Sequence, residues 1–238
     1  MKISIIIPTF NEATVIGRSL KQWQRYRDAN HLEVIVADGG STDGTVQIAQ
    51  PLADKIARKP DDRPETIARG RNRGAEVASG KILVFLDADV LVSDIDAFLA
   101  AVRQAFGSSS AIVAATARSG IYPKEAIWSD HIFHWLFWNY VKFLNRIGKG
   151  AAKGECQIIR TDVFRQLQGY NARLGAGEDF ELYNRLAKQG KIACLEVPVY
   201  ESPRRYRQVG YINLMRQWSI NYIRASQGKP VKKWSTVR

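Results

Sequence analysis

Largely apolar runs alternate with amphipathic stretches over the first 90 residues of the chain. Ile3–Ile7, Leu32–Ala37 and Ile82–Leu86 are short and rich in branched side chains, which predicts strands buried on both faces of a parallel sheet. Apolar residues recur at helical spacing in Glu12–Tyr26, and Glu65–Ser79 is a further predicted helix that Gly80 ends. Strands that alternate with helices predict an α/β fold with a doubly wound sheet.

The remainder of the chain repeats these two signals without an internal repeat or a low-complexity segment. The further predicted strands are Lys55–Arg58, 111–117, Cys156–Ile159 and Ile192–Val197. The further predicted helices are a short one through Ala49, 94–106, Ile127–Ile147, Thr161–Gln168, Glu181–Lys188 and the amphipathic Val209–Ala225.

Polar clusters follow three of the predicted strands. They are Thr9–Glu12 after the first strand, Asp38–Ser41 after the second, and Asp87 with Asp89 after the fourth. In doubly wound sheets the ligand crevice lies beyond the carboxyl ends of the strands. The three clusters therefore indicate one ligand site at that edge of the sheet.

Asp87 and Asp89 place two carboxylates in a tight turn after a buried strand. Such hard oxygen ligands suit Mg²⁺ or Mn²⁺ that is held mainly by a phosphate-bearing ligand and water. Asp-x-Asp by itself is more often a turn in which an Asp caps the next helix. The position of the pair at a strand end favours the metal site.

Three other segments combine polar chemistry with a plainer alternative. Asp38 can accept a hydrogen bond from a nucleoside, whereas the following glycine turn with Asp43 is typical of an ordinary helix cap. A cation of Arg69–Gly74 can face a diphosphate or lie on a solvated helix surface. Asp179 at a helix start is either a cap or, in company with Asp87, a candidate general base.

Five short segments, in this order and spacing, resemble the motifs of family 2 glycosyltransferases with the GT-A fold. The resemblance covers about residues 2–200 and implies an inverting transferase that uses a nucleotide-activated sugar and a divalent cation, Mn²⁺ or Mg²⁺. It implies one GT-A domain over 1–201 with a mostly parallel central sheet flanked by helices, a nucleotide-sugar-binding half (1–90) and an acceptor-binding half (91–201). The segments are Pro8-Thr-Phe-Asn-Glu12, Asp38-Gly-Gly-Ser-Thr-Asp-Gly44, Arg71-Asn-x-Gly74, Asp87-Ala-Asp89 and Gly177-Glu-Asp179.

The resemblance also implies roles for single residues. Asp179 matches the catalytic base, and Glu178 would orient the site or contact the acceptor. Asp87 and Asp89 would bind metal, with Asp87 also near the ribose. Many relatives have a metal-ligating His after the last strand, where this chain has Glu201 as a possible oxygen ligand, or no third ligand. The implied nucleotide-sugar-binding residues are Pro8, Thr9, Phe10, Glu12, Asp38, Gly39, Arg71, Asn72, Asp87 and Ala88.

Net charge changes this picture at the carboxyl end. The chain of 238 residues carries +12, yet residues 202–238 hold nine basic side chains and no acidic one, which leaves +3 for residues 1–201. Such a basic amphipathic segment suits nucleic acid, an anionic membrane or a phosphorylated ligand. Arg204–Arg207 is alternatively a clamp on the donor diphosphate.

The predicted helix Ile127–Ile147 carries seven aromatic residues and a polar stripe that includes Asp130 and His134. Its aromatic face can lie in a membrane interface, line an acceptor groove or pack against the sheet. The sequence favours packing against the sheet no more than the other two options together. Together with the basic segment, this helix suggests a peripheral enzyme on an anionic membrane, with a lipid-linked acceptor as one option among hydroxyl acceptors.

Other features restrict the class of protein. No apolar stretch approaches the roughly 20 residues that cross a bilayer, and the first apolar run stops at Pro8, so we expect a mature cytoplasmic amino terminus, with docking on the inner face of the membrane as an option. Cys156 and Cys194 are predicted to be buried free thiols.

Two rival functions fit the sequence less well. A sugar nucleotidyltransferase lacks support because no glycine-rich loop follows the first strand. A non-enzymatic nucleic-acid-binding protein is disfavoured because the body is nearly neutral and carboxylates stand at the strand ends.

Overall fold

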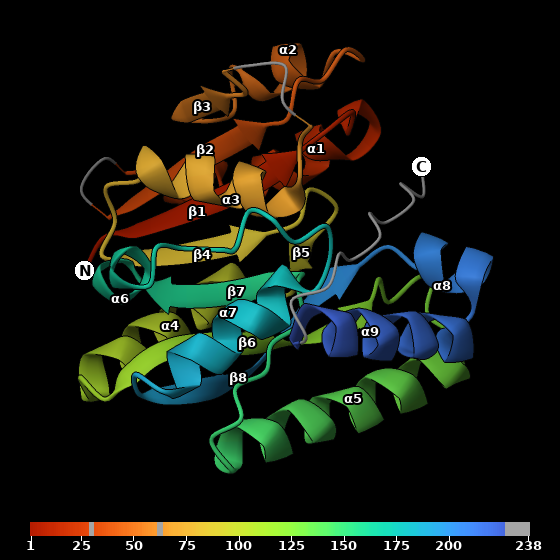
Figure 1. Cartoon of the computed structure of the whole chain (residues 1–238). Coiled ribbons are helices and arrows are strands. Elements are labelled where there is room, and N and C mark those ends of the chain that lie inside the picture. Colours follow the sequence, from red (N-terminus) through yellow and green to blue (C-terminus); the bar gives the residue numbers. More distant parts are fainter. Residues whose placement is uncertain (29–30, 61–63, 227–238) are drawn as a thin grey trace.

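A computed structural model describes residues 1–28, 31–60 and 64–226. Within them, the chain forms one eight-stranded sheet with the strand order β3-β2-β1-β4-β7-β6-β8-β5 (Figure 1). The part of the predicted basic segment beyond residue 226 lies outside the described residues. The strands are β1 Ile3–Thr9, β2 Leu32–Asp38, β3 Lys55–Arg58, β4 Ile82–Leu86, β5 Leu91–Val92, β6 Ile112–Ile121, β7 Cys156–Arg160 and β8 Lys191–Glu201.

The two halves of the sheet differ in strand direction. β3, β2, β1 and β4 are all parallel, as the continuous apolar runs predict. β7 is antiparallel to both β4 and β6, whereas β6 and β8 are parallel and β5 pairs antiparallel with β8. The predicted α/β architecture is therefore confirmed, and each antiparallel pair includes either β7 or the short strand β5.

Helices cover both faces of this sheet and extend beyond one end of it (Figure 1). Alternate residues of β1 explain the double coverage, because Ile5 packs in the cluster with α1 and α4, and Ile6 packs in the cluster with α3, α6 and α7. The helices are α1 Ala13–Lys21, the 3₁₀ helix η1 Gln24–Tyr26, α2 Thr45–Ala49, α3 Ile67–Glu76, α4 Ile95–Ser108, α5 Trp128–Arg146, α6 Thr161–Gln166, α7 Glu178–Ala187, α8 Arg204–Val209 and α9 Tyr211–Ser226.

Element boundaries differ from the sequence prediction at a few positions. α7 starts at Glu178 rather than Glu181, because Gly177 adopts a left-handed conformation (φ 78°) immediately before it. The predicted terminal helix Val209–Ala225 is α9, and Gly210 (φ 79°) separates it from the short helix α8, which was not predicted. The short strand β5 was not predicted, and it owes its conformation to pairing with β8.

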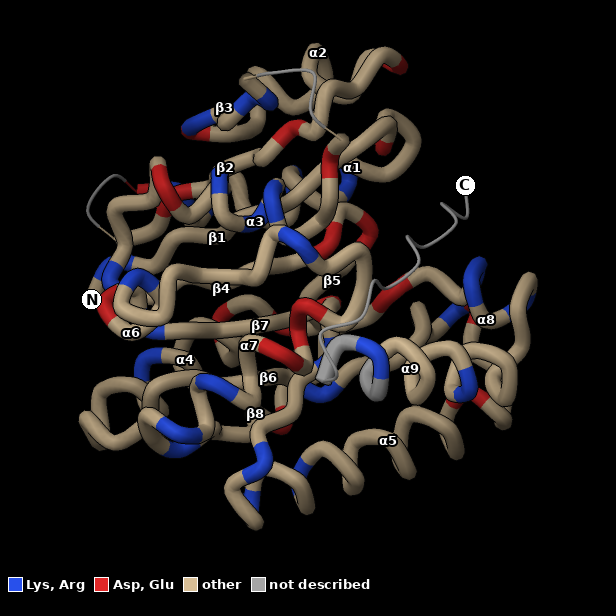
Figure 2. The backbone as a smooth tube through the Cα atoms, in the orientation of Figure 1, with Lys and Arg blue, Asp and Glu red and all other residues tan. Residues whose placement is uncertain are grey.

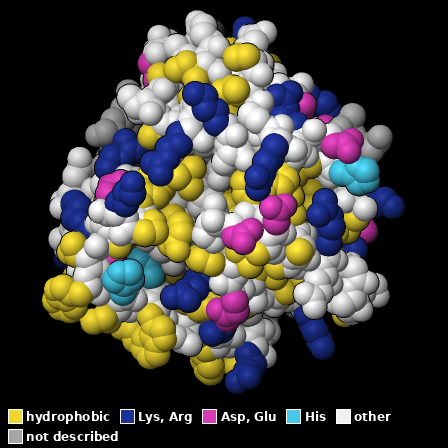
Figure 3. Space-filling model, turned by 180° about the vertical axis from the view of Figure 1, so that it is seen from behind, with side chains coloured by type: hydrophobic (Ala, Val, Ile, Leu, Met, Phe, Trp, Pro, Cys, Tyr) yellow, Lys and Arg dark blue, Asp and Glu magenta, His cyan; other side chains and the backbone are white. Residues whose placement is uncertain are grey.

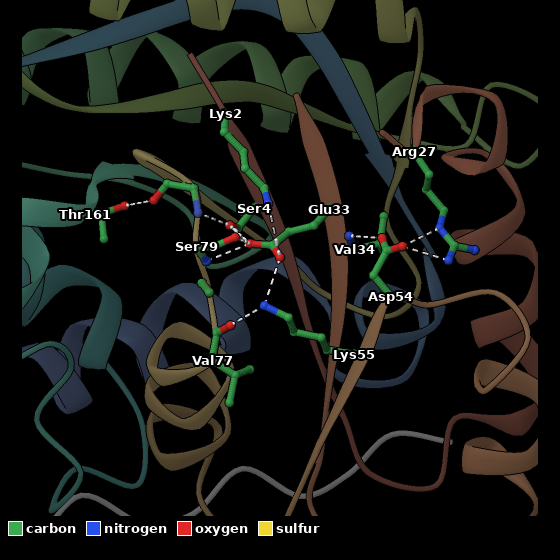
Figure 4. A network of polar contacts seen from close by, with 12 residues as sticks. Lys2, Ser4, Arg27, Glu33, Val34, Asp54, Lys55, Val77, Ser79 and Thr161 are labelled. Atoms are coloured by element: carbon green, nitrogen blue, oxygen red, sulfur yellow. Dashed lines mark hydrogen bonds and ion pairs between the residues drawn. The ribbon is translucent and has the colours of Figure 1, made fainter. Parts of the chain in front are cut away.

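Glu33 forms a buried polar network at the amino-terminal edge of the sheet (Figure 4). Its carboxylate accepts hydrogen bonds from Ser4 Oγ (2.6 Å) and from the backbone N–H (2.6 Å) and Oγ (2.8 Å) of Ser79, and it pairs with Lys55 (3.0 Å). Burial alone would raise the pKa of Glu33, but these donors lower it to about 2. The network ties β1 and β2 to the segment that enters β4.

Two further expectations concern cysteines and membranes. Cys156 is buried as predicted, whereas Cys194 is only half-buried, and both thiols are free. None of the helices in the described residues has the length and apolar character needed to span a bilayer.

Candidate active site

One cavity of about 730 Å³ lies at the carboxyl ends of β1, β2 and β4. Figure 2 shows acidic positions gathered at this end of the sheet, near β4, β5 and α7, and basic positions on α8 and α9. The edge predicted from the polar clusters is thus the edge that holds the cavity. Its walls include the predicted residues Pro8, Thr9, Phe10, Glu12, Gly39, Arg71, Asp87, Ala88, Asp89, Glu178, Asp179 and Glu201.

Two residues of the predicted set do not line this cavity. The carboxylate of Asp38 is buried and accepts hydrogen bonds from the backbone N–H groups of Gly40 (3.1 Å) and Ser41 (3.2 Å). The amide of Asn72 donates to the carbonyl of Tyr170 and accepts from its N–H, each at 2.9 Å. In this structure Asp38 shapes the turn after β2, and Asn72 holds the segment before α7.

Asp87 and Asp89 follow β4 in a turn closed by the hydrogen bond from the Val90 N–H to the Asp87 carbonyl (3.0 Å). Burial raises the pKa of Asp87 to about 6; Arg71 opposes this rise, whereas the Glu155 and Asp89 charges add to it. Burial also raises the pKa of Asp89, although Arg204 opposes that shift from 3.6 Å. The turn therefore keeps two carboxylates close together with too little positive charge to balance them.

Arg71 is a buried link between three segments of the site. Its Nη1 donates to Glu178 (2.7 Å), and its Nη2 donates to Asp87 (3.0 Å) and to the Gly154 carbonyl (2.9 Å). The charges of Asp87 and Glu178 hold the pKa of this guanidinium above its usual range despite its burial. Both terminal nitrogens are thus engaged with the chain itself, which positions Asp87 and Glu178 relative to each other.

Asp179 lies in the first turn of α7. Its Oδ1 accepts a hydrogen bond from the Phe180 N–H (2.8 Å), and Oδ2 lies so close to the 153–155 segment that a Cβ on Gly154 would be 3.3 Å from it. Burial, reinforced by the negative charge of Glu178, raises the pKa of Asp179 to about 8, although Arg71 opposes the shift. A carboxylate with such a pKa is a stronger proton acceptor than an ordinary Asp.

The cavity wall beside Asp87 contains residues that the sequence analysis missed. Lys153 is buried and pairs with Glu201, with the Tyr206 hydroxyl (2.6 Å) and with Glu155 (3.4 Å). Burial alone would lower the pKa of Lys153, but Glu155 and Glu201 raise it. The only sequence signal for this wall was the glycine-bearing run from Gly150 that leads into β7.

The predicted clamp Arg204–Arg207 does not act as one unit. Arg207 pairs with the buried Asp130 of α5, with Nη1 2.8 Å from Oδ1, and so turns away from Asp89. Arg204 and Arg205 line the cavity, and Arg204 lies near Asp89. Only the first half of the predicted clamp is therefore placed at the site.

The donor atoms of the site fit a hard divalent cation that also binds phosphate. Asp87 and Asp89 offer carboxylate oxygens, and Glu155 Oε2 is buried without a hydrogen-bond partner among the described residues. The described part of the chain holds no cluster of three or more His, Cys, Asp or Glu arranged for a metal. Mg²⁺ and Mn²⁺ sites that use substrate phosphates need only one or two protein carboxylates.

Comparisons with known proteins place the chain in a family. The model of the family "Glycosyl transferase family 2" matches residues 4–167. The chain is 38% identical over 93 residues to validoxylamine A glucosyltransferase of Streptomyces hygroscopicus subsp. jinggangensis, covering 37% of the chain and 22% of that protein. It is 34% identical over 97 residues to GalNAc(5)-diNAcBac-PP-undecaprenol beta-1,3-glucosyltransferase of Campylobacter jejuni, covering 37% and 29%. The chain thus spans less than a third of these curated relatives.

A solved structure of low sequence identity shares the fold. Mannosyltransferase PcManGT from Pyrobaculum calidifontis, in complex with GDP-Man and Mn²⁺, superposes with a TM-score of 0.73 at 21% identity, over 96% of this chain and 64% of that one. The fold is accordingly that of the GT-A glycosyltransferases, which confirms the fold class expected from the sequence.

Proposed function

The chain belongs to glycosyl transferase family 2, and from that premise we propose that it transfers a sugar from a nucleotide-diphospho-sugar to an acceptor hydroxyl with inversion. The observation that carries the proposal is Asp179, a carboxyl with its pKa raised to about 8 in the same cavity as Asp87 and Asp89. A base set apart from a pair of metal-binding carboxylates is what such a transfer requires.

Residues 1–90 would form the part of the proposed site that binds the nucleotide-sugar donor. Pro8, Thr9, Phe10 and Gly39 form the wall at the ends of β1 and β2, where the nucleoside would lie. A side chain on Gly39 would meet Glu65 Cγ at 2.9 Å and the Thr9 carbonyl at 3.2 Å, so glycine allows the two strand ends to approach each other. Arg204 and Arg205 supply positive charge to the diphosphate side of the same cavity.

Asp87 and Asp89 are proposed to hold Mn²⁺ or Mg²⁺, with Glu201 as a weaker candidate because it already pairs with Lys153. The metal, when bound, would neutralise negative charge on the diphosphate. The chain's own contribution is positional, because Arg71 holds Asp87 at 3.0 Å and is itself held by Glu178 at 2.7 Å. Through Arg71, Glu178 would orient the site.

The proposed chemical step is one displacement. Asp179 accepts the proton of the acceptor hydroxyl while that oxygen forms a bond to the anomeric carbon of the sugar. The bond from this carbon to the diphosphate oxygen breaks, and the nucleoside diphosphate leaves with the bonding electron pair. Attack from the face opposite the leaving group inverts the anomeric configuration.

The acceptor is proposed to reach Asp179 from the part of the cavity formed by residues 91–201 and by α9, where Phe137, Phe180 and Trp218 line the wall. Their apolar surface suits a lipid-linked acceptor. The relative from Campylobacter jejuni carries a PP-undecaprenol compound in its name, which favours this choice. A cytoplasmic enzyme at the inner face of the membrane would meet such an acceptor.

Calorimetric titration with UDP, GDP, dTDP and CDP, each with and without Mn²⁺, tests donor binding. Metal-dependent binding of one of them, lost in Asp89→Ala and kept in the surface control Asp96→Ala, is the expected result. Binding of arbitrary DNA without binding of any nucleoside diphosphate would contradict the proposal and support the nucleic-acid-binding alternative. Formation of a nucleotide-sugar from a sugar phosphate and a nucleoside triphosphate would support the nucleotidyltransferase alternative.

A further inference from the structure

The outward side of α5 is covered with large apolar side chains. They recur three to four residues apart, so they share one side of the helix, and the exposed fraction of each is between 47% and 75%. Polar exposed residues on the same side are His131, Asn139 and Arg146. We call this surface the α5 face, and its apolar members are Trp128, Ile132, Trp135, Leu136, Tyr140, Phe143 and Ile147.

The buried side of α5 is partly polar, which inverts the usual arrangement of a surface helix. Asp130 is buried and pairs with Arg207 and the Tyr211 hydroxyl. Burial alone would raise the pKa of Asp130, but these donors lower it to about 2. His134 is also buried, near Ser119 Oγ (3.4 Å), and burial lowers its pKa to about 2. Two residues of the predicted polar stripe, Asp130 and His134, thus face the protein.

These contacts fix the rotation of α5 about its own axis. Turning the aromatic side inward would separate Asp130 from Arg207 and from the Tyr211 hydroxyl. Such a rotation is unfavourable because it would leave the buried Asp130 carboxylate without a charged partner. The fold therefore maintains the exposure of the aromatic side chains, and an exposed patch of this size marks an interaction site.

α9 extends this surface beside α5 (Figure 1). Trp218 contacts Phe133 and Phe137, with ring centroids 6.3 and 5.8 Å apart. Ile212 and Met215 of α9 are exposed. Viewed from behind, hydrophobic side chains project along the edge of the molecule where α5 lies, next to histidine side chains (Figure 3).

The exposed charged residues of α5 and α9 are basic. Asp130 is the only acidic residue in the α5 sequence and is buried, and the α9 sequence has no Asp or Glu. Arg146 at the end of α5, and Arg216 and Arg224 on α9, are exposed. Glu196 lies at the edge of the α5 face but pairs with Lys142 at 3.3 Å.

We propose that the α5 face and the exposed side of α9 dock on an anionic lipid bilayer. Trp and Tyr side chains favour the interface between lipid and water, and Lys or Arg near an anionic leaflet adds about 1 kcal/mol each. The sequence after α9 adds four basic residues and no acidic one. A second copy of the chain fits less well, because a symmetric contact would bring Arg146, Arg216 and Arg224 against their own counterparts.

Docking here connects the bilayer to the proposed active site, a step that rests on the proposed function. Phe137 of α5 and Trp218 of α9 contact each other and also line the cavity that contains Asp179. A lipid-linked acceptor can therefore keep its chain in the bilayer and reach the cavity between the two helices. The aromatic wall would contact the part of the acceptor nearest the lipid.

Vesicle flotation of the full chain tests the docking. The protein is expected to float with vesicles of phosphatidylcholine mixed with phosphatidylglycerol, and much less with phosphatidylcholine alone. Trp135→Ser combined with Phe143→Ser should lower the partition coefficient roughly tenfold, whereas the control Ile48→Ser with Val77→Ser, two exposed apolar residues elsewhere, should not. Arg216→Glu with Arg224→Glu should remove the preference for anionic vesicles, and Arg103→Glu, exposed on α4, should keep it.

Two results would overturn the docking proposal. One is absence of flotation with anionic vesicles, and the other is a dimer in sedimentation velocity that dissociates in the Trp135→Ser, Phe143→Ser variant. Binding of a nucleoside diphosphate with Mn²⁺ is measured on the same samples. Flotation without nucleoside diphosphate binding would refute the proposed donor and leave the docking intact. Nucleoside diphosphate binding without flotation would refute the docking alone.

Discussion

At the amino-terminal edge of the sheet hydrogen-bond donors surround the Glu33 carboxylate and outweigh its burial. At the carboxyl edge burial outweighs the positive charges near Asp87, Asp89 and Asp179, which line one cavity. The pKa of Glu33 falls to about 2, and the pKa of Asp179 rises to about 8. The Glu33 network lies at the amino ends of the parallel strands, and the cavity lies at their carboxyl ends.

The difference separates a structural carboxylate from functional ones. Hydrogen bonds from Ser4, Ser79 and Lys55 stabilise the ionised carboxylate of Glu33, so this charge stabilises the folded state. At the other edge burial outweighs the compensation by Arg71 and Arg204, so the charged forms of Asp87, Asp89 and Asp179 are disfavoured, which a bound cation or a transferred proton would relieve. Groups with pKa values raised in a cleft are candidates for function for this reason.

The largest expected effect concerns catalysis at Asp179. Asp179→Asn keeps the shape of the side chain but removes its proton-accepting oxygen, so we expect turnover to fall about 10²- to 10⁴-fold. The affinity for the nucleoside diphosphate should change little. Sugar transfer and calorimetric binding are compared in the variant and in Asp96→Asn; unchanged turnover would rule out Asp179 as the base.

The next effect concerns metal-dependent binding at Asp89. Asp89→Ala removes one of two candidate oxygen ligands, and we expect the affinity for a nucleoside diphosphate in Mn²⁺ to fall about 10- to 100-fold. Binding without Mn²⁺ should differ far less between the variant and the wild type. Equal metal dependence in both proteins would show that Asp89 holds no metal.

Glu33→Gln tests the structural side of the comparison. Because the folded pKa of Glu33 lies below its usual 4.5, its charge stabilises the fold above pH 4.5, and this stability is lost as pH falls toward 2. We expect Glu33→Gln to lower the free energy of unfolding by about 2 kcal/mol at pH 7. Urea unfolding across pH should show the difference shrinking in acid, while nucleoside diphosphate binding persists.

The smallest expected effect is on the free energy of unfolding of Asp179→Asn, and it is opposite in sign to that of Glu33→Gln. The folded pKa of Asp179 is raised from 3.8 to about 8, so its contribution to stability is present below pH 3.8 and is lost as pH rises through 8. Asp179→Asn should therefore stabilise the metal-free protein by about 1 kcal/mol at pH 8. Thermal unfolding in the presence of a chelator measures this; a destabilised variant would place Asp179 with Glu33 as a structural carboxylate.

The first half of the fold and most of the site were predictable from local sequence. Runs such as Ile3–Ile7 can only be buried on both faces, and the polar residues that follow parallel strands must meet at one edge. Local pattern alone thus places Pro8, Asp87 and Asp89 together. The short strand β5 could not be predicted in this way, because two residues form a strand only through their pairing with β8.

The contacts that tune the site depend on distant parts of the chain. Arg71 and Glu178 are 107 positions apart, and Lys153 and Glu201 are 48 apart, so no local pattern signals either pair. The aromatic helix shows the same limit. Its sequence predicted a polar stripe that includes Asp130 but left open which side of the helix packs, and the contact with Arg207, 77 positions away, places Asp130 inside the protein.

The sequence by itself determined the elements and the edge at which carboxylates gather, because apolar periodicity and strand direction are local properties. Only the tertiary structure decided which carboxyl is paired and which is not, and which side of α5 faces solvent. Burial and ion pairing depend on residues that approach each other only in the folded chain, and these set both the pKa of Asp179 and the exposure of the α5 face.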